Sequence, residues 1–434
     1  MTPKEFVTVL DEWSANGGIF SEGISHDYVI TTEEEANAVC RALSSGHMYA
    51  IDSSKLPTLH RLLAFFQSVK TKEAGNVFRD RGLPLLRKVL TDALDGPRAA
   101  DTEDRAAEES ERTHLFLVKI LAMYQQPGDA SLIVKAARDP GISKGYMWSV
   151  VFDIVAERHP DAVAICEGLR DPLPDGFLGV AYLDFANALA IKQLITRHPF
   201  DSDVGIARLV AYLGDRDPEL YSYAVSATAS IPFVNTSARE TLMVSADQHP
   251  DALVRLEAAW ALTRTGSEFG RQRLARLCLD PRHSERAIRY LEELGLGAHI
   301  PSRARAPDFR AMAEMCSWLM HPNEFGRPPD QITQYDTREL NWPPTRDRRR
   351  LWLFKYRYEP QGVDGQADEG IGIVGSTTFA LFGEANSDLA PEDVYGLHCC
   401  WELQIQEDPR APEKRDAAIG RQMLAEANPG FASP

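Results

Sequence analysis

Hydrophobic side chains recur at helical spacing through the middle of the chain. In SKGYMWSVVFDIVAERH (residues 143–159), apolar pairs return every four residues, at positions 146/147, 150/151 and 154/155. This spacing is typical of an amphipathic helix with one apolar stripe. The stretch GVAYLDFANALAIKQLI is apolar nearly all round, which predicts a helix covered on both sides. Similar patterns predict about eleven short helices between Thr113 and Leu294, uninterrupted by strands.

A short phrase, His-Pro-Asp-Ala, follows two of these helical stretches. It begins at His159 and again at His249, and a degenerate copy, His-Pro-Phe-Asp, begins at His198. A residue before proline is pushed out of the α region, so a helix is expected to end near each histidine. Asp161 and Asp251 are expected to cap the next helix through its backbone N–H groups. The three prolines stand at 160, 199 and 250, which gives spacings of 39 and 51 residues, and a pair of antiparallel helices with its turns needs about forty residues.

Residues 108–295 resemble the HEAT and armadillo class of helical repeats. The clearest match is DALVRLEAAWALTRTG, residues 251–266, which resembles the second helix of a HEAT unit with its closing glycine. The resemblance implies a mainly α fold, an α-α superhelix whose curved surface binds a partner, usually another protein. Residues 1–100 also have helical patterns, and we interpret them as leading repeats that cap the array. The alternative fold is an irregular all-α bundle.

The pattern changes after residue 306, and residues 307–434 are expected to form a small α+β domain. RAMAEMCSWLM and PEDVYGLHCCWELQIQ are predicted helices. Between them, LWLFKYRYE alternates strictly, which predicts a strand with the aromatic residues 352, 354, 356 and 358 on one face. GIGIVGSTTFALFG is expected to be a second strand. The predicted order is α–β–β–α, and the aromatic face requires a helix against it.

The chain is acidic, which narrows the classes of partner. Its 63 acidic and 47 basic residues give a formal net charge of −16. Nucleic acids and anionic membranes attract cationic surfaces, so binding to either is disfavoured. No apolar run approaches the roughly twenty residues that a membrane-spanning helix needs. Six scattered cysteines without a CxxC pair suit reduced thiols, and we expect a cytoplasmic protein.

Two short motifs match those of enzymes, but their surroundings do not. Gly370, Gly372 and Gly375 match GxGxxG, yet an acidic loop precedes them and a strand-like segment follows. A dinucleotide fold needs a strand and then a helix there, so we interpret these glycines as easing a tight strand. The residues around Ser143 match the GxSxG nucleophile elbow, but their helical surroundings favour a helix N-cap. No catalytic residue is therefore assigned.

Two groups of histidines and cysteines resemble metal ligands. The histidines of the repeated phrase lie in successive repeats, about 10 Å apart, whereas zinc holds its nitrogen ligands at about 2.1 Å. His398, Cys399 and Cys400 are adjacent on one predicted helix, where neighbouring side chains point about 100° apart. They cannot all surround one ion, and we interpret them as a buried seam. The alternative is a structural zinc site that also uses Cys316 and His321. No metal or cofactor is assigned.

The proline-broken segment before the aromatic strand is the candidate recognition surface. Polar and aromatic side chains on irregular backbone are suited to recognition, which gives five candidate binding residues: Tyr335, Asp336, Arg338, Glu339 and Trp342. TRDRRR, residues 345–350, is the one dense basic patch. It either binds a phosphate or an acidic partner, or is a solvated segment at the start of the strand.

These patterns favour a non-enzymatic scaffold or adaptor that binds a protein partner through its helical repeats. The alternative is a small-molecule sensor or an enzyme with its pocket in the C-terminal domain. A deep pocket with convergent polar groups at the strand–helix junction would favour the sensor, and a filled aromatic core would favour the scaffold. A nucleic-acid binder is disfavoured by the charge.

Overall fold

The computed structural model describes residues 1–16, 24–25, 27–45, 55–96, 104–321, 323–360, 367–382 and 387–431. The expected N-terminal region 1–100 therefore lies only partly within the described residues. The chain divides into two compact units, Met1–Gln248 and His249–Pro434, and each is described by itself. The expected domains 1–100, 108–295 and 307–434 are a different division and stay predictions.

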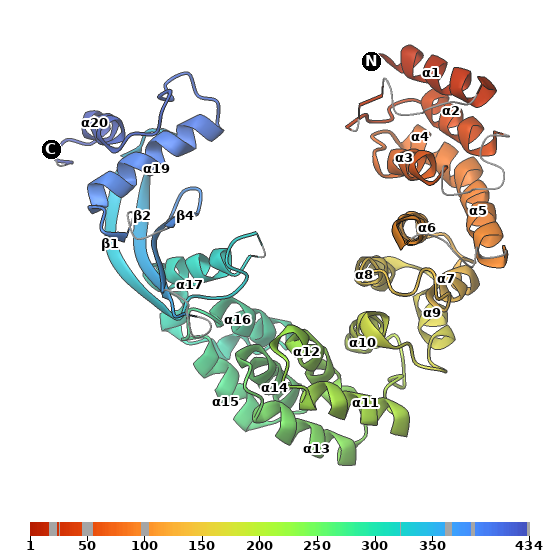
Figure 1. The fold of residues 1–434 in the computed structure, drawn as a ribbon. Coiled ribbons are helices and arrows are strands. Elements are labelled where there is room, and N and C mark those ends of the chain that lie inside the picture. Colours follow the sequence, from red (N-terminus) through yellow and green to blue (C-terminus); the bar gives the residue numbers. More distant parts are fainter. Residues whose placement is uncertain are drawn as a thin grey trace. The chain divides into compact units, whose positions relative to one another are not determined.

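The first unit consists of helices packed in layers (Figure 1). Helices α6, α8, α10 and α12 contact one another in series and form one layer. Helices α5, α7 and α9 contact one another in a second layer, and α11 contacts α13. The helices are α1 (Pro3–Asn16), α2 (Glu33–Ser44), α3 (Leu56–Gln67), α4 (Lys72–Val77), α5 (Leu83–Asp95), α6 (Asp104–Tyr124), α7 (Ala130–Ala137), α8 (Trp148–Arg158), α9 (Ala162–Gly168), α10 (Gly176–Ile191), α11 (Asp203–Gly214), α12 (Tyr221–Ser230) and α13 (Thr236–Asp247). A π-helical turn (Phe78–Gly82) joins α4 to α5.

The predicted helices are present, but one predicted stripe is rotated. α10 is buried nearly all round, as expected for a helix flanked by α8 and α12. In α8 the buried residues include Trp148, Val151 and Val155. Tyr146 and Val150, which the sequence assigned to the apolar stripe, are instead 72% and 40% exposed. Only one side of the predicted stripe therefore faces the core.

The repeated His-Pro phrase forms a turn held by the histidine itself. The buried imidazole accepts a hydrogen bond at Nδ1 from the backbone N–H two residues later, at 3.1 Å for His159, 3.3 Å for His198 and 3.1 Å for His249. A ring nitrogen that accepts carries no proton, so each imidazole is neutral with its proton on Nε2. α8 and α13 end just before their histidines, as expected, but α10 ends at Ile191, well before His198.

The aspartates of the phrase mostly join neighbouring helix pairs. Asp161 accepts hydrogen bonds from the backbone N–H groups of Gly128 (2.6 Å) and Asp129 (3.0 Å), at the start of α7. Asp201 accepts from the N–H of Asn235 (3.0 Å), which precedes α13. Asp251 caps its own helix through Val254 N–H (3.0 Å). The predicted cap is therefore confirmed for Asp251 and wrong for Asp161, whose carboxylate serves the preceding repeat.

The second unit begins with helices and ends in an α+β part (Figure 1). α14 packs on α15, α15 on α16, and α16 on α17. The elements are α14 (Ala252–Arg264), α15 (Glu268–Leu277), α16 (Ser284–Glu293), α17 (Pro307–Leu319), β1 (Gln331–Trp342), β2 (Asp347–Tyr358), β3 (Asp368–Val374), β4 (Phe379–Phe382), α19 (Pro391–Ile405) and α20 (Ala417–Ala427). Residues 113–294, all described, contain no strand, and eleven α-helices (α6 to α16) cover this stretch.

An antiparallel sheet with strand order β1-β2-β3-β4 is covered on both faces by helices. Phe354, Tyr356 and Tyr358 of β2 pack against α17 through Met315 and Leu319, so the predicted aromatic face and its covering helix are confirmed. The opposite face packs against α19 and α20. The alternation of β2 thus places two apolar layers on either side of one sheet.

The C-terminal domain has more elements than the sequence predicted. The segment of residues 331–342, expected to be irregular, is the strand β1, and the expected second strand is divided by a turn at Gly375 into β3 and β4. The helix α20 was not predicted. The elements within the described residues run α–β–β–β–β–α–α, and β1 and β4 complete a sheet that two strands alone could not stabilise.

We expect acid to destabilise the repeats through the buried histidines. Burial lowers the pKa of His159 below 6.5 and lowers the pKa of His198 to about 4. Below pH 6.5 the unfolded chain therefore binds more protons than the folded chain. Stability is fully present above pH 6.5 and falls as the pH falls toward the lowered pKa. His159→Asn keeps an acceptor for the Asp161 N–H but does not titrate. Urea unfolding at about pH 7.5 and about pH 5 measures the unfolding free energy. Between these two pH values, this variant should lose less unfolding free energy than the natural chain.

The matched control is His159→Ala, which has no acceptor. It should lose about 1–3 kcal/mol of unfolding free energy already at neutral pH, because the Asp161 N–H is left without its partner. Equal pH dependence in the natural chain and in His159→Asn would contradict the assigned role of the imidazole.

Candidate functional site

All five candidate residues lie on β1, and strand alternation separates them. Tyr335, Asp336, Arg338 and Trp342 lie on the side of α19, whereas Glu339 lies on the opposite side beside Arg350 of β2. They therefore do not form one recognition patch. Each must be judged by its own contacts.

Arg338 anchors α19 to the sheet. Its Nε donates to Asp336 at 2.8 Å, and a terminal guanidinium nitrogen bonds to Glu392 in the first turn of α19. The guanidinium also lies over the rings of Tyr395 (5.5 Å to the centroid) and Phe431 (5.4 Å). The hydrogen bond with Arg338 lowers the pKa of Glu392. Arg338 is therefore occupied within the domain.

Trp342 belongs to the core. It is fully buried, and its Nε1 donates to Glu402 Oε2 at 2.8 Å. Glu402 also accepts from the hydroxyl of Ser376 at 2.8 Å. Tyr335 is half-buried and donates its hydroxyl to the Leu389 carbonyl at 3.1 Å, with Lys355 Nζ 4.4 Å from its ring centroid. Trp342 is unavailable to a partner, and Tyr335 offers one ring edge at most.

The basic patch is partly neutralised within the hairpin. Glu339 accepts from Arg348 at 3.0 Å and from Arg350 at 2.6 Å, and Arg349 pairs with Asp347 at 2.7 Å. Arg348 and Arg350 share a single carboxylate, and their side chains stay 71% and 52% exposed. The end of the β1–β2 hairpin is consequently cationic on the face that carries Glu339.

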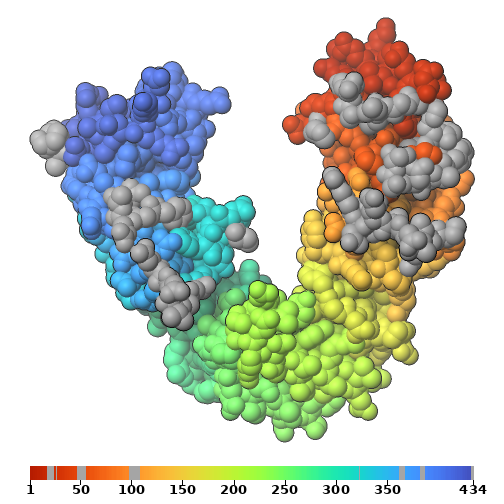
Figure 2. Space-filling view, in the orientation of Figure 1, coloured from red at the N-terminus to blue at the C-terminus, as the bar shows by residue number. Residues whose placement is uncertain are grey.

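The layer of α6, α8, α10 and α12 exposes apolar side chains. Tyr146, just before α8, is 72% exposed, Val150 is 40% exposed, and Phe177 at the start of α10 is 37% exposed. α8 and α10 contact each other, so these residues begin neighbouring helices of one layer. The helices that carry them form the yellow part of the surface in Figure 2. The sequence missed this surface because it assigned Tyr146 and Val150 to the core.

Carboxylates follow the apolar residues along the same helices. Asp153 and Glu157 of α8 and Asp184 of α10 are exposed. Burial raises the pKa of Asp153, although its side chain reaches solvent, because neighbouring protein atoms displace water around it.

The two enzyme-like motifs have structural roles. A Cβ on Gly372 would lie 1.9 Å from Met315 Sδ of α17, and a Cβ on Gly370 would lie 2.4 Å from the Leu381 carbonyl oxygen. Gly375 has φ +114°, a conformation that glycine adopts without strain. These glycines let helix and strands approach, as expected. Ser143 lies in a turn, and α8 begins later, at Trp148, so its predicted N-cap role is wrong.

The histidine–cysteine group of α19 is buried. His398 is 3% exposed, and its ring stacks near Trp342 and Trp401. Burial lowers the pKa of His398 to about 3 and raises the pKa of the Cys399 thiol to about 12, which keeps both groups neutral. Within the described residues, no group of three or more histidine, cysteine or acidic side chains is arranged to hold a metal ion.

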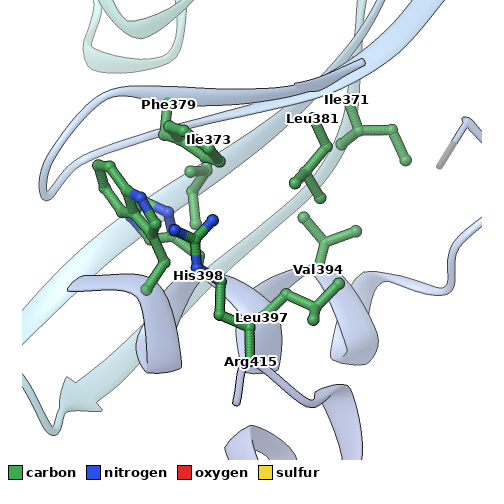
Figure 3. Close-up of a pocket in the computed structure, with 9 residues that line it drawn as sticks. Ile371, Ile373, Phe379, Leu381, Val394, Leu397, His398 and Arg415 are labelled. Carbon is green, nitrogen blue, oxygen red and sulfur yellow. The ribbon is translucent and has the colours of Figure 1, made fainter. Parts of the chain in front are cut away.

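A small cavity lies between the sheet and α19 (Figure 3). Its volume is about 50 Å³, and seven of its nine lining residues are apolar. The lining residues are Ile371, Ile373, Phe379, Leu381, Val394, Leu397, His398, Trp401 and Arg415. Sites for small organic ligands usually measure about 300–1,000 Å³. This strand–helix junction is close to a filled aromatic core, which favours the scaffold over the sensor.

A wider groove lies over α16 and α17. It measures about 490 Å³, is open to solvent and is lined in part by the carboxylates of Glu285, Glu314 and Glu324, with the half-buried ring of Trp318. Carboxylates beside an indole suit a cationic side chain. Because the groove is open to solvent, it suits contact with a protein surface better than enclosure of a small molecule.

The comparisons with known proteins concern the helical part. Residues 206–295 match the family model of HEAT repeats, from within α11 to the end of α16. The chain contains HEAT repeats. The match includes residues 251–266, the segment with the clearest resemblance, and HEAT repeats are commonly protein-interaction scaffolds. A search of curated proteins and a search of solved structures each returned no match. Among the described residues, no helix is both long enough and apolar enough to span a membrane.

We expect Gly372→Ala to destabilise the C-terminal domain by about 1–3 kcal/mol, because the new methyl group overlaps the buried Met315 side chain. Thermal unfolding measures the loss. Met315→Ala removes the overlapping atoms, so the double variant should be more stable than the sum of the two single effects predicts. If the stability losses of the two single variants simply added in the double variant, the close packing of α17 on β3 would be contradicted.

Proposed function

We propose that this protein is a non-enzymatic scaffold whose HEAT-repeat array binds a protein partner through the layer of α6, α8, α10 and α12. The observation that carries this proposal is the exposure of Tyr146, Val150 and Phe177 at the start of neighbouring helices. Apolar side chains grouped on adjacent elements of a soluble protein mark interaction surfaces more often than singly scattered ones do.

The charges on this layer select the partner's chemistry. Asp153, Glu157 and Asp184 lie on the same helices as the exposed apolar residues. Apolar anchors give an interface its affinity, and complementary charge around them gives orientation and a faster encounter. The matching surface is therefore apolar at its centre and basic at its rim. A folded or helical partner meets these requirements.

The non-enzymatic part of the proposal is supported by the structural roles of the residues that match enzyme motifs. The glycine motif packs α17 on the sheet, Ser143 lies in a turn, and His398 is enclosed by aromatic rings. The cavity beside His398 is too small for an ordinary substrate. The open groove with Glu314 and Trp318 offers a second contact for a basic partner, which suits an adaptor.

We expect the combined variant Tyr146→Ser, Val150→Ser and Phe177→Ser to bind its partner roughly tenfold more weakly or worse, because each change removes an exposed apolar anchor. Affinity capture from the lysate of the native organism, quantified by mass spectrometry, measures the loss. The fold should be retained, since the three side chains are at the surface.

The matched control changes three exposed valines of the other helices, Val204, Val210 and Val244, to serine. These lie on α11 and α13, outside the proposed layer, so partner capture should stay at the natural level. A photo-crosslinking residue at position 150 should capture the partner and one at position 244 should not. Equal losses in both triple variants would refute the assignment of this layer.

A further inference from the structure

β1 forms one margin of the sheet and presents a free edge. The strand order places β2 on one side of β1, and Figure 1 shows the other side at the outside of the sheet. A free edge carries backbone N–H and C=O groups that a neighbouring strand would normally satisfy. Natural proteins block such edges or use them to bind extended segments.

At one position of this edge, Asn341, the outward backbone groups are already hydrogen-bonded by the side chain of Asn428. The amide of Asn428 accepts the backbone N–H of Asn341 at 2.6 Å and donates to the Asn341 carbonyl at 3.0 Å. Asn341 also donates its side-chain Nδ2 to the Ala427 carbonyl at 3.0 Å. The backbone groups of Asn341 therefore point away from β2, toward the free edge.

The outward direction of Asn341 identifies the next open positions. Along a strand of an antiparallel pair, the backbone N–H and C=O groups of one residue point toward the partner strand, and those of the next residue point away from it. The register runs without interruption from Trp342 back to Asp336, so Glu339 and Thr337 also point outward. Both residues are exposed. Among the described residues, none bonds to these outward backbone groups.

The open window is short and has two defined ends. The register shifts between Gln334 and Asp336, and such a bulge ends regular pairing on that side. The Asn428 amide ends it on the other side. Between them, two N–H and two C=O groups are open to one added strand. Among the described residues, these two ends carry the bulge and the paired side chain that interrupt the open edge.

The charges beside the window favour acidic side chains. Arg348 and Arg350 lie on the same face as Thr337 and Glu339, share the one carboxylate of Glu339, and remain more than half exposed. An added strand places every second side chain on this face. Because the two arginines outnumber the one carboxylate of Glu339 on this face, acidic residues at those positions are favoured over basic ones.

We propose that the β1 edge binds an extended, acidic segment of a partner protein by strand addition at Thr337 and Glu339. The inference deepens the proposed scaffold role, on which it rests, by naming a further contact, for a partner segment of acidic rather than basic chemistry. It uses residues separate from the repeat layer, so either assignment can fail alone.

The probe is a fluorescent hexapeptide, Glu-Val-Glu-Val-Glu-Val, titrated with the full chain and followed by anisotropy. Its control is Lys-Val-Lys-Val-Lys-Val. We expect the acidic peptide to bind at least tenfold more tightly than the basic one. Thr337→Pro removes an outward N–H and should weaken binding at least tenfold relative to Thr337→Ala. The variant with Tyr146, Val150 and Phe177 changed to serine should bind the peptide like the natural chain, which separates this test from that of the repeat layer.

Melting temperatures of proline variants test whether backbone N–H groups along β1 alternate between outward and inward directions. Thr337→Pro should melt at the temperature of Thr337→Ala, because the lost N–H faces away from β2. Arg338→Pro should melt lower, because its N–H belongs to the ladder. If Thr337→Pro does not fold, Glu339→Pro against Glu339→Ala replaces it. With both Arg348→Glu and Arg350→Glu, the chain should bind the basic peptide more tightly than the acidic one.

Three outcomes would overturn the proposal. The first is no binding of the acidic peptide at about 1 mM chain, where an interaction is worth only ~4 kcal/mol. The second is equal binding of both peptides. The third is concentration-dependent dimerisation that Thr337→Pro abolishes, which would assign the edge to a second copy of this chain.

Discussion

The central helix α10 has more apolar surface than one neighbour can cover, and the packing of the first unit depends on this constraint. In α10, Tyr182, Leu183 and Phe185 point in different directions and are all buried, because α8 and α12 lie on either side. A helix pair taken alone would leave such surface in water, so stability lies in the contacts between successive pairs. The connecting turns must then keep successive helices in a fixed relation. Within the first unit, the turns at His159 and His198 and the aspartates that bond 32 to 34 residues away supply that restraint.

The sequence allowed the helices to be predicted because the helical period is encoded locally in each of them. It did not allow their orientation to be predicted equally well. Around α8, apolar residues occupy most of the circumference, and only the neighbouring helices decide that Trp148 is buried while Tyr146 is exposed. Two residues of the proposed binding surface, Tyr146 and Val150, are ones that the local pattern places in the core. A single sequence carries no signal that separates the two cases.

The C-terminal domain was predictable where alternation is strict and unpredictable where it is broken. β2 alternates without interruption, and its aromatic face lies against α17 as expected. β1 changes register between Gln334 and Asp336, which reverses the side-chain pattern halfway along the strand. Trp342 is buried because Glu402, sixty residues away in the chain, accepts its indole N–H. A long-range polar partner of this kind turns an apparent surface tryptophan into a core residue, and local patterns do not reveal it.

Net charge describes this chain less well than the placement of its charges. Several acids of the repeats are used internally: Asp129 is buried beside Arg87, and Asp161 and Asp201 satisfy backbone N–H groups. Exposed acids remain on α8 and α10, whereas the β1–β2 hairpin leaves two arginines to one carboxylate. The repeat layer of the first unit and the β1 edge of the second unit therefore attract groups of opposite charge. A single partner of uniform charge cannot satisfy both surfaces. Occupation of both requires either one partner with segregated charge or two partners, and bringing two partners together is the physical content of a scaffold.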